Sequence, residues 1–314
     1  MKRTSVFISV LILSSGLQSS TVSARADTSP AQRPSNAELD ARIKALIAKV
    51  KSSLRPLKGG TFEMGDWGTE AGQHYDSETW SRPLHKVTLD GFSMMAYKVT
   101  YEDFDVFTDA VGRERINMDK VGIRDRAPKR PAGVNWHGAK DYCRWLGKLS
   151  GLSFDLPTEA QWEYAARSGG KRVLFSTDNG KIERLRNFPE EWNGGKRPSL
   201  PDVGRYPPNS AGLYGMSENT REWVQDWFKA DYYSMSPSKN PSGPSAGTEK
   251  VMRGSTGGTA EIAAMVFMRT KAAPRTKQGS YPLASAYAKR AITPLPGYSS
   301  SYLDNFRCVV NSSE

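Results

Sequence analysis

From residue 168 to residue 301 the sequence shows no helical periodicity, and Gly, Pro, Ser and Asn interrupt it every few residues. The whole chain has 28 glycines, 19 prolines and 8 tryptophans, and aromatic residues make up 10% of it. This composition is typical of a loop-rich globular domain and not of a disordered chain. Irregular segments of this length inside a compact domain indicate a functional surface or a segment held by a ligand.

Regular elements are expected mainly before residue 168. Apolar residues at helical spacing predict helices over residues 35–54, 101–111, 138–149 and 158–167, and short strands are expected at 61–64 and 85–89. Ser35 with Glu38, and Thr158 with Gln161, form capping-box patterns at two helix starts. The side chains expected to face the core are Phe104, Phe107, Val111, Ala139, Tyr142, Cys143, Leu146, Trp162, Ala165 and Ala166.

The first 26 residues are predicted to be an export signal. Lys2 and Arg3 precede a mostly apolar run over residues 6–17, and a small-x-small cleavage pattern ends at Ala26. That run is too short to span a membrane. We therefore expect a soluble periplasmic or secreted protein, with a flexible segment and a helix at 27–58. One domain of about 250 residues, at 59–311, is long enough to bury a sizeable core.

The chain carries 44 basic and 33 acidic residues, a formal net charge of +11. Removing Lys2, Arg3 and Arg25 with the signal leaves 41 basic against 33 acidic residues, a net charge of +8. Such a balance favours acidic partners through long-range attraction. Nucleic acid is a poor candidate, because the basic residues are scattered, no nucleic-acid motif occurs and the compartment is wrong.

Ordered motifs span the expected domain. They are GGTFEMG at 59–65, PAGVNW at 131–136, AKDYCRWLG at 139–147, LPTEAQWEYAAR at 156–167, GLYGMSENTREWV at 212–224, VMRGS at 251–255 and FRCV at 306–309. In order and spacing they resemble the formylglycine-generating enzyme family, also called the sulfatase-modifying-factor family. The resemblance implies a mixed α/β (α+β) fold related to C-type lectins, in one irregular, loop-rich domain.

The resemblance also exposes a missing reactive centre. Family members that oxidise a substrate cysteine to formylglycine bind copper(I) with two neighbouring cysteines of their own, since soft thiolates suit that ion. The matching region, 262–291, contains no cysteine. Copper is therefore not expected. His74, His85 and His137 lack metal-ligand spacing, so a histidine metal site is not expected either.

Two calcium sites of the family have partial counterparts here. Position by position, the first falls on Gly215, Glu218, Thr220 and Glu222, where backbone carbonyls and a carboxylate would meet the ion. Gly215 has no side-chain oxygen, and calcium normally takes six to eight oxygen ligands. A weak structural calcium site and a metal-free loop in which Glu222 only hydrogen-bonds are both open. Asn187 and Phe188 match the start of the second site, whose acidic ligand is not evident.

The two cysteines of the chain, Cys143 and Cys308, match a pair that the family joins in a disulfide. The resemblance therefore implies a structural disulfide across 165 residues, which an exported compartment permits. A reactive thiol pair is the alternative, but neither a neighbouring base nor close spacing supports it.

Two functional hypotheses remain. The first is a binding or accessory protein without formylglycine-generating activity, which recognises a protein or glycan; one concrete version is a secretion-system or periplasmic partner. The second is a periplasmic enzyme with altered, cysteine-independent oxidative or maturation chemistry in the old cleft. Its candidate residues are Arg253, Ser255, Arg269 and Arg290, although the first two are more readily explained as residues that hold the fold together through hydrogen bonds.

Overall fold

A computed structural model describes residues 34–68, 72–120, 122–190, 200–218, 220–255, 261–275 and 297–311. Residues from Pro34 onward form one compact unit, which includes the N-terminal helix. The expected export signal and the polar segment that follows it lie outside the described residues. None of the helices within these ranges is long and apolar enough to cross a membrane.

The helices follow their local sequence signals closely. Ser35 caps the first helix by accepting a hydrogen bond from the Glu38 amide, and Thr158 and Gln161 form a complete capping box at the start of another. The helices are α1 (Asn36–Ser53), α2 (Tyr101–Ala110), α3 (Gly122–Asp125), α4 (Trp136–Ser150) and α5 (Glu159–Ala166), with 3-10 turns η2 (Tyr232–Ser234) and η3 (Glu261–Ala264).

The described strands form three small sheets. The first has the order β1 (Leu54–Leu57), β4 (Phe92–Met95), β10 (Val309–Asn311), β5 (Phe154–Asp155), and the second pairs β2 (Gly60–Met64) with β3 (His85–Leu89). The third has the order β8 (Arg269–Ala272), β7 (Lys250–Arg253), β6 (Arg221–Trp227), β9 (Asp304–Asn305). In it, β6 pairs in parallel with β9, so the C-terminal segment returns beside the 213–222 loop.

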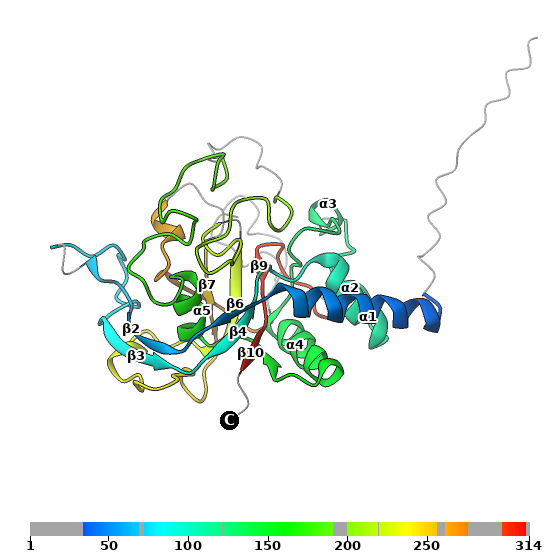
Figure 1. The fold of residues 1–314 in the computed structure, drawn as a ribbon, viewed down its shortest axis with the longest axis horizontal. Coiled ribbons are helices and arrows are strands. Elements are labelled where there is room, and N and C mark those ends of the chain that lie inside the picture. Colours follow the sequence, from blue (N-terminus) through cyan, green and yellow to red (C-terminus); the bar gives the residue numbers. More distant parts are fainter. Residues whose placement is uncertain are drawn as a thin grey trace, which may run out of the picture. The chain divides into compact units, whose positions relative to one another are not determined.

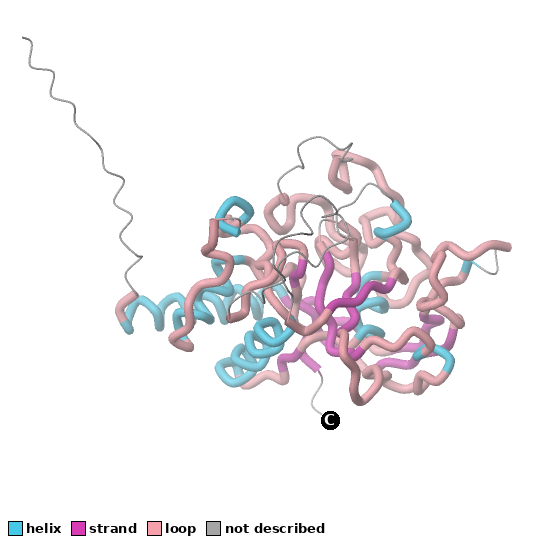
Figure 2. The backbone as a smooth tube through the Cα atoms, turned by 180° about the vertical axis from the view of Figure 1, so that it is seen from behind, coloured by secondary structure: helices cyan, strands magenta, loops and turns pink. Residues whose placement is uncertain are grey.

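Helices α1, α2 and α4 pack against one another on the opposite side of the domain from β2 and β3 (Figure 1). Helix α1 buries Leu46 and Val50 in the same core cluster as Phe104 and Tyr142, so its apolar side packs on its own domain. Irregular connections make up much of the tube in Figure 2. The expected mixed α+β, loop-rich fold is confirmed.

Two expectations about local structure need correction. Val111 was placed on the apolar side of its helix, but α2 ends at Ala110 and Val111, its C-terminal cap, is 42% exposed. Once the backbone leaves the helix, the side chain no longer follows the helical face. The N-terminal helix ends at Ser53, because the chain turns at Leu54 into β1 and pairs with β4. Pro56 is tolerated there because β1 is an edge strand.

Candidate functional site

A buried ammonium group lies inside the loop to which the family resemblance assigned calcium. Lys98, between β4 and α2, is 4% exposed. Its Nζ donates hydrogen bonds to the backbone oxygens of Glu218 at 3.2 Å and Thr220 at 3.1 Å, and to Thr220 Oγ1 at 2.7 Å. The two backbone carbonyls assigned to a metal therefore already face a positive charge.

The carboxylate of Glu222 is held by a second cation. Arg307 donates from Nε to Oε2 at 2.7 Å and from Nη2 to Oε1 at 2.9 Å, and both side chains are buried. Arg307 also donates to the backbone oxygens of Ala96 and Tyr214. Lys98 Nζ lies 3.9 Å from Glu222 Oε1. These contacts tie the 213–222 loop to the segment after β4 and to the C-terminal segment.

Burial dominates the electrostatics of this centre. It lowers the pKa of Lys98 to about 8, although the carboxylate of Glu222 acts in the opposite direction. It raises the pKa of Glu218 to about 7, against the attraction of Lys98 and Arg307. Each charge is thus costly to desolvate and depends on its neighbours for compensation.

This arrangement does not fit a calcium ion. Gly215, whose counterpart in the family offers a side-chain oxygen, has a positive φ of 71°. A Cβ atom built at Gly215 would lie 3.9 Å from Lys98 Nζ, so a ligand placed there would meet the ammonium. Among the described residues, no three His, Cys, Asp or Glu side chains lie close enough together to hold a metal ion. His74, His85 and His137 are among the residues covered by this statement.

The second expected calcium site is also engaged in protein contacts. Asn187 is 1% exposed, and its Oδ1 accepts the Glu183 amide at 2.8 Å. Its Nδ2 donates to Asp178 and Asn179 side-chain oxygens. Phe188 is buried, and its backbone oxygen accepts the Leu185 amide. These contacts make residues 183–188 a hydrogen-bonded turn. The stretch 191–199 lies outside the described residues.

The expected cleft arginines lie in the interior. Arg253 is fully buried and bridges two carboxylates, Glu159 Oε1 and Glu163 Oε2, each at 2.7 Å. Arg269 is 2% exposed and clasps both oxygens of Glu159 at 2.7 Å and 3.0 Å. Burial opposes ionisation of Glu159, but the two guanidinium groups outweigh it and lower the pKa of that carboxyl. These arginines therefore connect α5 to β7 and β8.

One further member of that expected cleft, Ser255, is also buried. Ser255 is 2% exposed and lies two residues after the end of β7. Arg290 lies outside the described residues. Asp226 joins the buried network by accepting the Glu159 amide at 2.8 Å. The network thus has the connections expected of a group that holds the fold together.

The two cysteines form the disulfide implied by the resemblance. Cys143 of α4 and Cys308 are bonded at 2.03 Å, and both are fully buried. The sequence contains 2 cysteines in total, so the oxidised chain has no thiol left. The donor set for copper(I), two neighbouring thiolates, is therefore absent from the residues of this chain.

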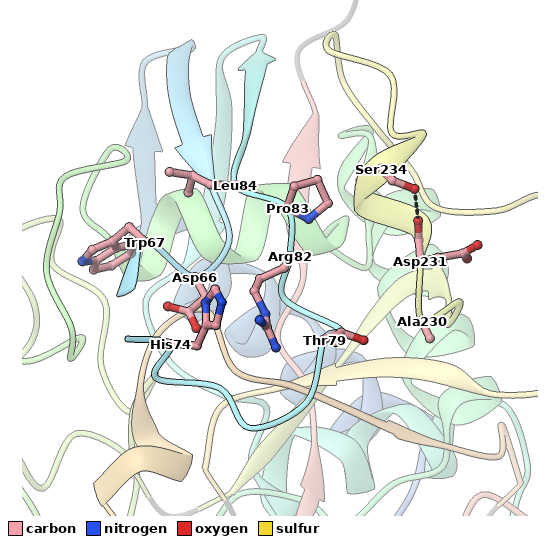
Figure 3. A pocket seen from close by; sticks show the side chains of 10 residues that line it. All are labelled: Asp66, Trp67, His74, Thr79, Arg82, Pro83, Leu84, Ala230, Asp231 and Ser234. Atoms are coloured by element: carbon pink, nitrogen blue, oxygen red, sulfur yellow. Dashed lines mark hydrogen bonds between the residues drawn. The ribbon is translucent and has the colours of Figure 1, made fainter. Parts of the chain in front are cut away.

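The described part of the chain also forms a surface pocket. This pocket of about 660 Å³ is lined by residues of two parts of the chain, 66–67 with 74–84 and 230–234 (Figure 3). Its lining is Asp66, Trp67, His74, Thr79, Arg82, Pro83, Leu84, Ala230, Asp231 and Ser234. Sequence reasoning missed these residues, because the pocket arises from loops distant in sequence.

The first of these loops is shaped by a buried carboxylate. Asp66 is 1% exposed and accepts hydrogen bonds from the amides of Gly68, Tyr75 and Asp76. Since its oxygens are committed to the loop backbone, Asp66 supports the pocket wall. The more exposed His74, Thr79 and Asp231 lie at the rim of the pocket.

Sequence reasoning also missed Lys98. One signal could have pointed to it: Lys98 is the only charged residue in the mostly apolar run from Phe92 to Tyr101. A lysine in a segment that must be buried needs a paired charge or hydrogen-bonding partners. The identity of those partners was not accessible from this run.

Several named proteins are similar to this chain over more than half of its length. The serine/threonine-protein kinase pkn1 of Chlamydia pneumoniae is 33% identical over 218 residues, covering 63% of this chain and 32% of the kinase. The chain thus spans about a third of that protein's length. The formylglycine-generating enzyme of Streptomyces coelicolor is 33% identical over 250 residues, covering 63% of this chain and 76% of the enzyme. The inactive C-alpha-formylglycine-generating enzyme 2 of Bos taurus is 27% identical over 229 residues, covering 55% of this chain and 70% of that protein.

A solved structure supports the fold. That of PvdO from Pseudomonas aeruginosa superposes with a TM-score of 0.61 at 24% identity, covering 82% of this chain and 94% of PvdO. The family model described as the sulfatase-modifying factor enzyme 1-like domain matches residues 49–282. The motifs, the fold and this match together establish that the chain belongs to the sulfatase-modifying factor enzyme 1-like family, whose members include formylglycine-generating enzymes.

Proposed function

We propose that this chain is an exported member of the family that does not generate formylglycine and that acts as a binding or accessory protein. The observation that carries the proposal is the use of both cysteines, Cys143 and Cys308, in one buried disulfide. Copper(I) chemistry of the family's kind needs thiolates, and a disulfide sulfur is not one. The proposal includes export to an oxidising compartment, where such a disulfide persists.

The other candidate groups support the same direction. Arg253 and Arg269 are buried in ion pairs with Glu159 and Glu163, so a substrate would have to displace a compensated carboxylate to reach them. A relative that is named as inactive, from Bos taurus, indicates that the family scaffold can be kept without the oxidase activity. Neither point requires a metal in this chain.

The partner in this proposal is a protein or a glycan that binds at the pocket between 66–84 and 230–234. The pocket combines apolar side chains, Trp67, Pro83 and Leu84, with the guanidinium of Arg82. Such a mixture suits a ligand that has an apolar body and a few polar groups. A secretion-system or periplasmic protein is the partner class that we favour.

A peptide oxidation assay tests the catalytic half of the proposal. The purified, disulfide-bonded chain is incubated with copper(I), oxygen and a sulfatase-type cysteine peptide. The mass of the peptide is then measured by mass spectrometry. We expect an unchanged peptide, whereas the Streptomyces coelicolor enzyme under the same conditions should convert it. Aldehyde formation by this chain would contradict the proposal, and a different mass change would favour the cysteine-independent enzyme.

Site-specific photo-crosslinking tests the binding half. A photoreactive amino acid is placed at Ser234, on the pocket rim, and in a control at Leu149, which is exposed on α4. In cells that export the chain, we expect a discrete adduct from Ser234 that Leu149 does not form. Equal labelling from both positions would contradict partner binding at this pocket.

A further inference from the structure

The ammonium of Lys98 meets as many acceptors as it has donors. A lysine side chain carries three N–H donors and no acceptor. The structure supplies three oxygens within hydrogen-bonding distance, the Glu218 and Thr220 carbonyls and Thr220 Oγ1, at 3.2, 3.1 and 2.7 Å. Glu218 and Thr220 therefore supply an acceptor for each of the three N–H donors of the ammonium. Calcium, which takes six to eight oxygens, would be left short of ligands by the same set.

The charges around the loop are also balanced without a metal. Lys98 and Arg307 contribute two positive charges, and Glu222 and Glu218 contribute two carboxyl groups. Arg307 already occupies both oxygens of Glu222. A divalent ion added here would leave an excess of buried positive charge, which is strongly unfavourable at low dielectric. Protonation of Glu218 would enlarge that excess.

The lack of a side-chain oxygen at Gly215 is also consistent with a loop whose positive charge comes from Lys98. An asparagine could adopt the positive φ of Gly215, since Asn tolerates the left-handed region. Its Cβ would lie 3.6 Å from Glu218 Oε1 and 3.8 Å from Lys98 Cε, within ordinary contact. A Cβ atom is therefore accommodated at this position, and the side chain beyond it would lie beside the ammonium of Lys98.

From these contacts we infer that Lys98 is the built-in cation of the 213–222 loop, which takes the place of a calcium ion and makes the loop independent of metal. This inference goes beyond the proposed function and does not depend on it. It predicts that the metal requirement can be restored by removing the ammonium and returning the missing oxygen.

The first test uses the unmodified, disulfide-bonded chain. Its melting temperature should be the same in millimolar calcium and in excess chelator, and added terbium should show no emission sensitised by the neighbouring Trp223. A melting temperature that falls on chelation, with the calcium-dependent part abolished by Glu222→Gln, would overturn the inference. This test needs no variant that could fail to fold.

The second test exchanges one cation for the other. Lys98→Ala combined with Gly215→Asn should be less stable than the unmodified chain in chelator and should regain melting temperature with calcium. Gly215→Asn alone is the matched control, because it adds the oxygen but keeps Lys98, and it should not respond to calcium. A calcium response in this control would overturn the inference.

A third variant tests whether the loop needs a cation at all. Lys98→Met preserves much of the length of the side chain while removing its charge. We expect a lower melting temperature in chelator, together with loss of protection of the Thr220 region in hydrogen exchange. An unchanged melting temperature would show that Lys98 is dispensable and would overturn the inference. If the Lys98 variants do not fold, the unmodified chain and Gly215→Asn still decide whether metal binds.

Discussion

Arg307 and Glu222 form a fully buried bidentate ion pair, with N···O distances of 2.7 and 2.9 Å. Glu222 lies on β6, and Arg307 follows β9, which pairs in parallel with β6 at Glu222 and Asn305. The strand register therefore places two residues that are 85 positions apart in the chain side by side. Lys98 Nζ lies 3.9 Å from Oε1 of the same carboxylate.

Glu222→Gln should destabilise the protein by about 3–5 kcal/mol, because it leaves two buried cations, Arg307 and Lys98, without their carboxylate. Urea denaturation followed by fluorescence measures the change. Glu114→Gln is the control, since Glu114 is exposed and should change stability by no more than about 0.5 kcal/mol. Equal stability of the two variants would show that the carboxylate charge is not required.

Loss of the disulfide should cost about 2–5 kcal/mol of unfolding free energy, because the bond closes a loop between positions 165 apart. The variant with Cys143→Ala and Cys308→Ala is compared with the oxidised chain in urea. Fully reduced unmodified protein is the control that keeps both sulfur atoms in the core, and it separates the crosslink from packing. If complete reduction leaves the midpoint unchanged, the crosslink contributes no stability.

Arg269→Met should lower stability by about 3–5 kcal/mol, since Glu159 loses its bidentate partner in the interior. Adding Glu159→Gln should recover part of the loss, and a double-mutant cycle measures the coupling. Arg172→Met is the control, because the Arg172–Glu63 pair is exposed and such pairs contribute about 0–1 kcal/mol. An Arg269→Met protein of normal stability that had lost partner binding would instead place Arg269 at a recognition site.

Asp226→Asn should change the pH dependence of stability. Burial, with repulsion from Glu159, raises the pKa of Asp226 from 3.8 to about 7. The folded state therefore holds this proton more tightly than the unfolded state, and the stability it contributes is lost as pH rises from 3.8 to about 7. The melting temperature of the unmodified chain should fall relative to that of Asp226→Asn across this window and then run parallel.

The exposed Asp40→Asn variant serves as the control for that measurement, because its melting curve should follow the unmodified chain at every pH. A constant difference between Asp226→Asn and the unmodified chain from pH 4 to pH 8 would show that Asp226 titrates alike in the folded and unfolded states.

Local signals predicted the helices well. The capping box of Thr158 and Gln161 and the apolar positions of α4 depend on residues three or four apart, and the structure confirms both. The side chain of Val111 could not be placed in this way, because the helix ends one residue before it and the cap sets its direction. The role of Arg253 stayed open for a related reason: the sequence shows an arginine in a strand but not the carboxylates that pair with it.

The sequence by itself determined the family, the order of the helices and the lack of a thiol pair, because each depends on residue identity or on short-range spacing. Only the tertiary structure decided that Lys98 enters the 213–222 loop, that Arg307 holds Glu222 and that Arg253 and Arg269 pair with α5. Lys98 is 122 positions from Thr220, and Arg253 is 94 from Glu159. Contacts of that range depend on how the sheets and helices pack, since a buried charge takes whichever partners the packed chain brings within reach.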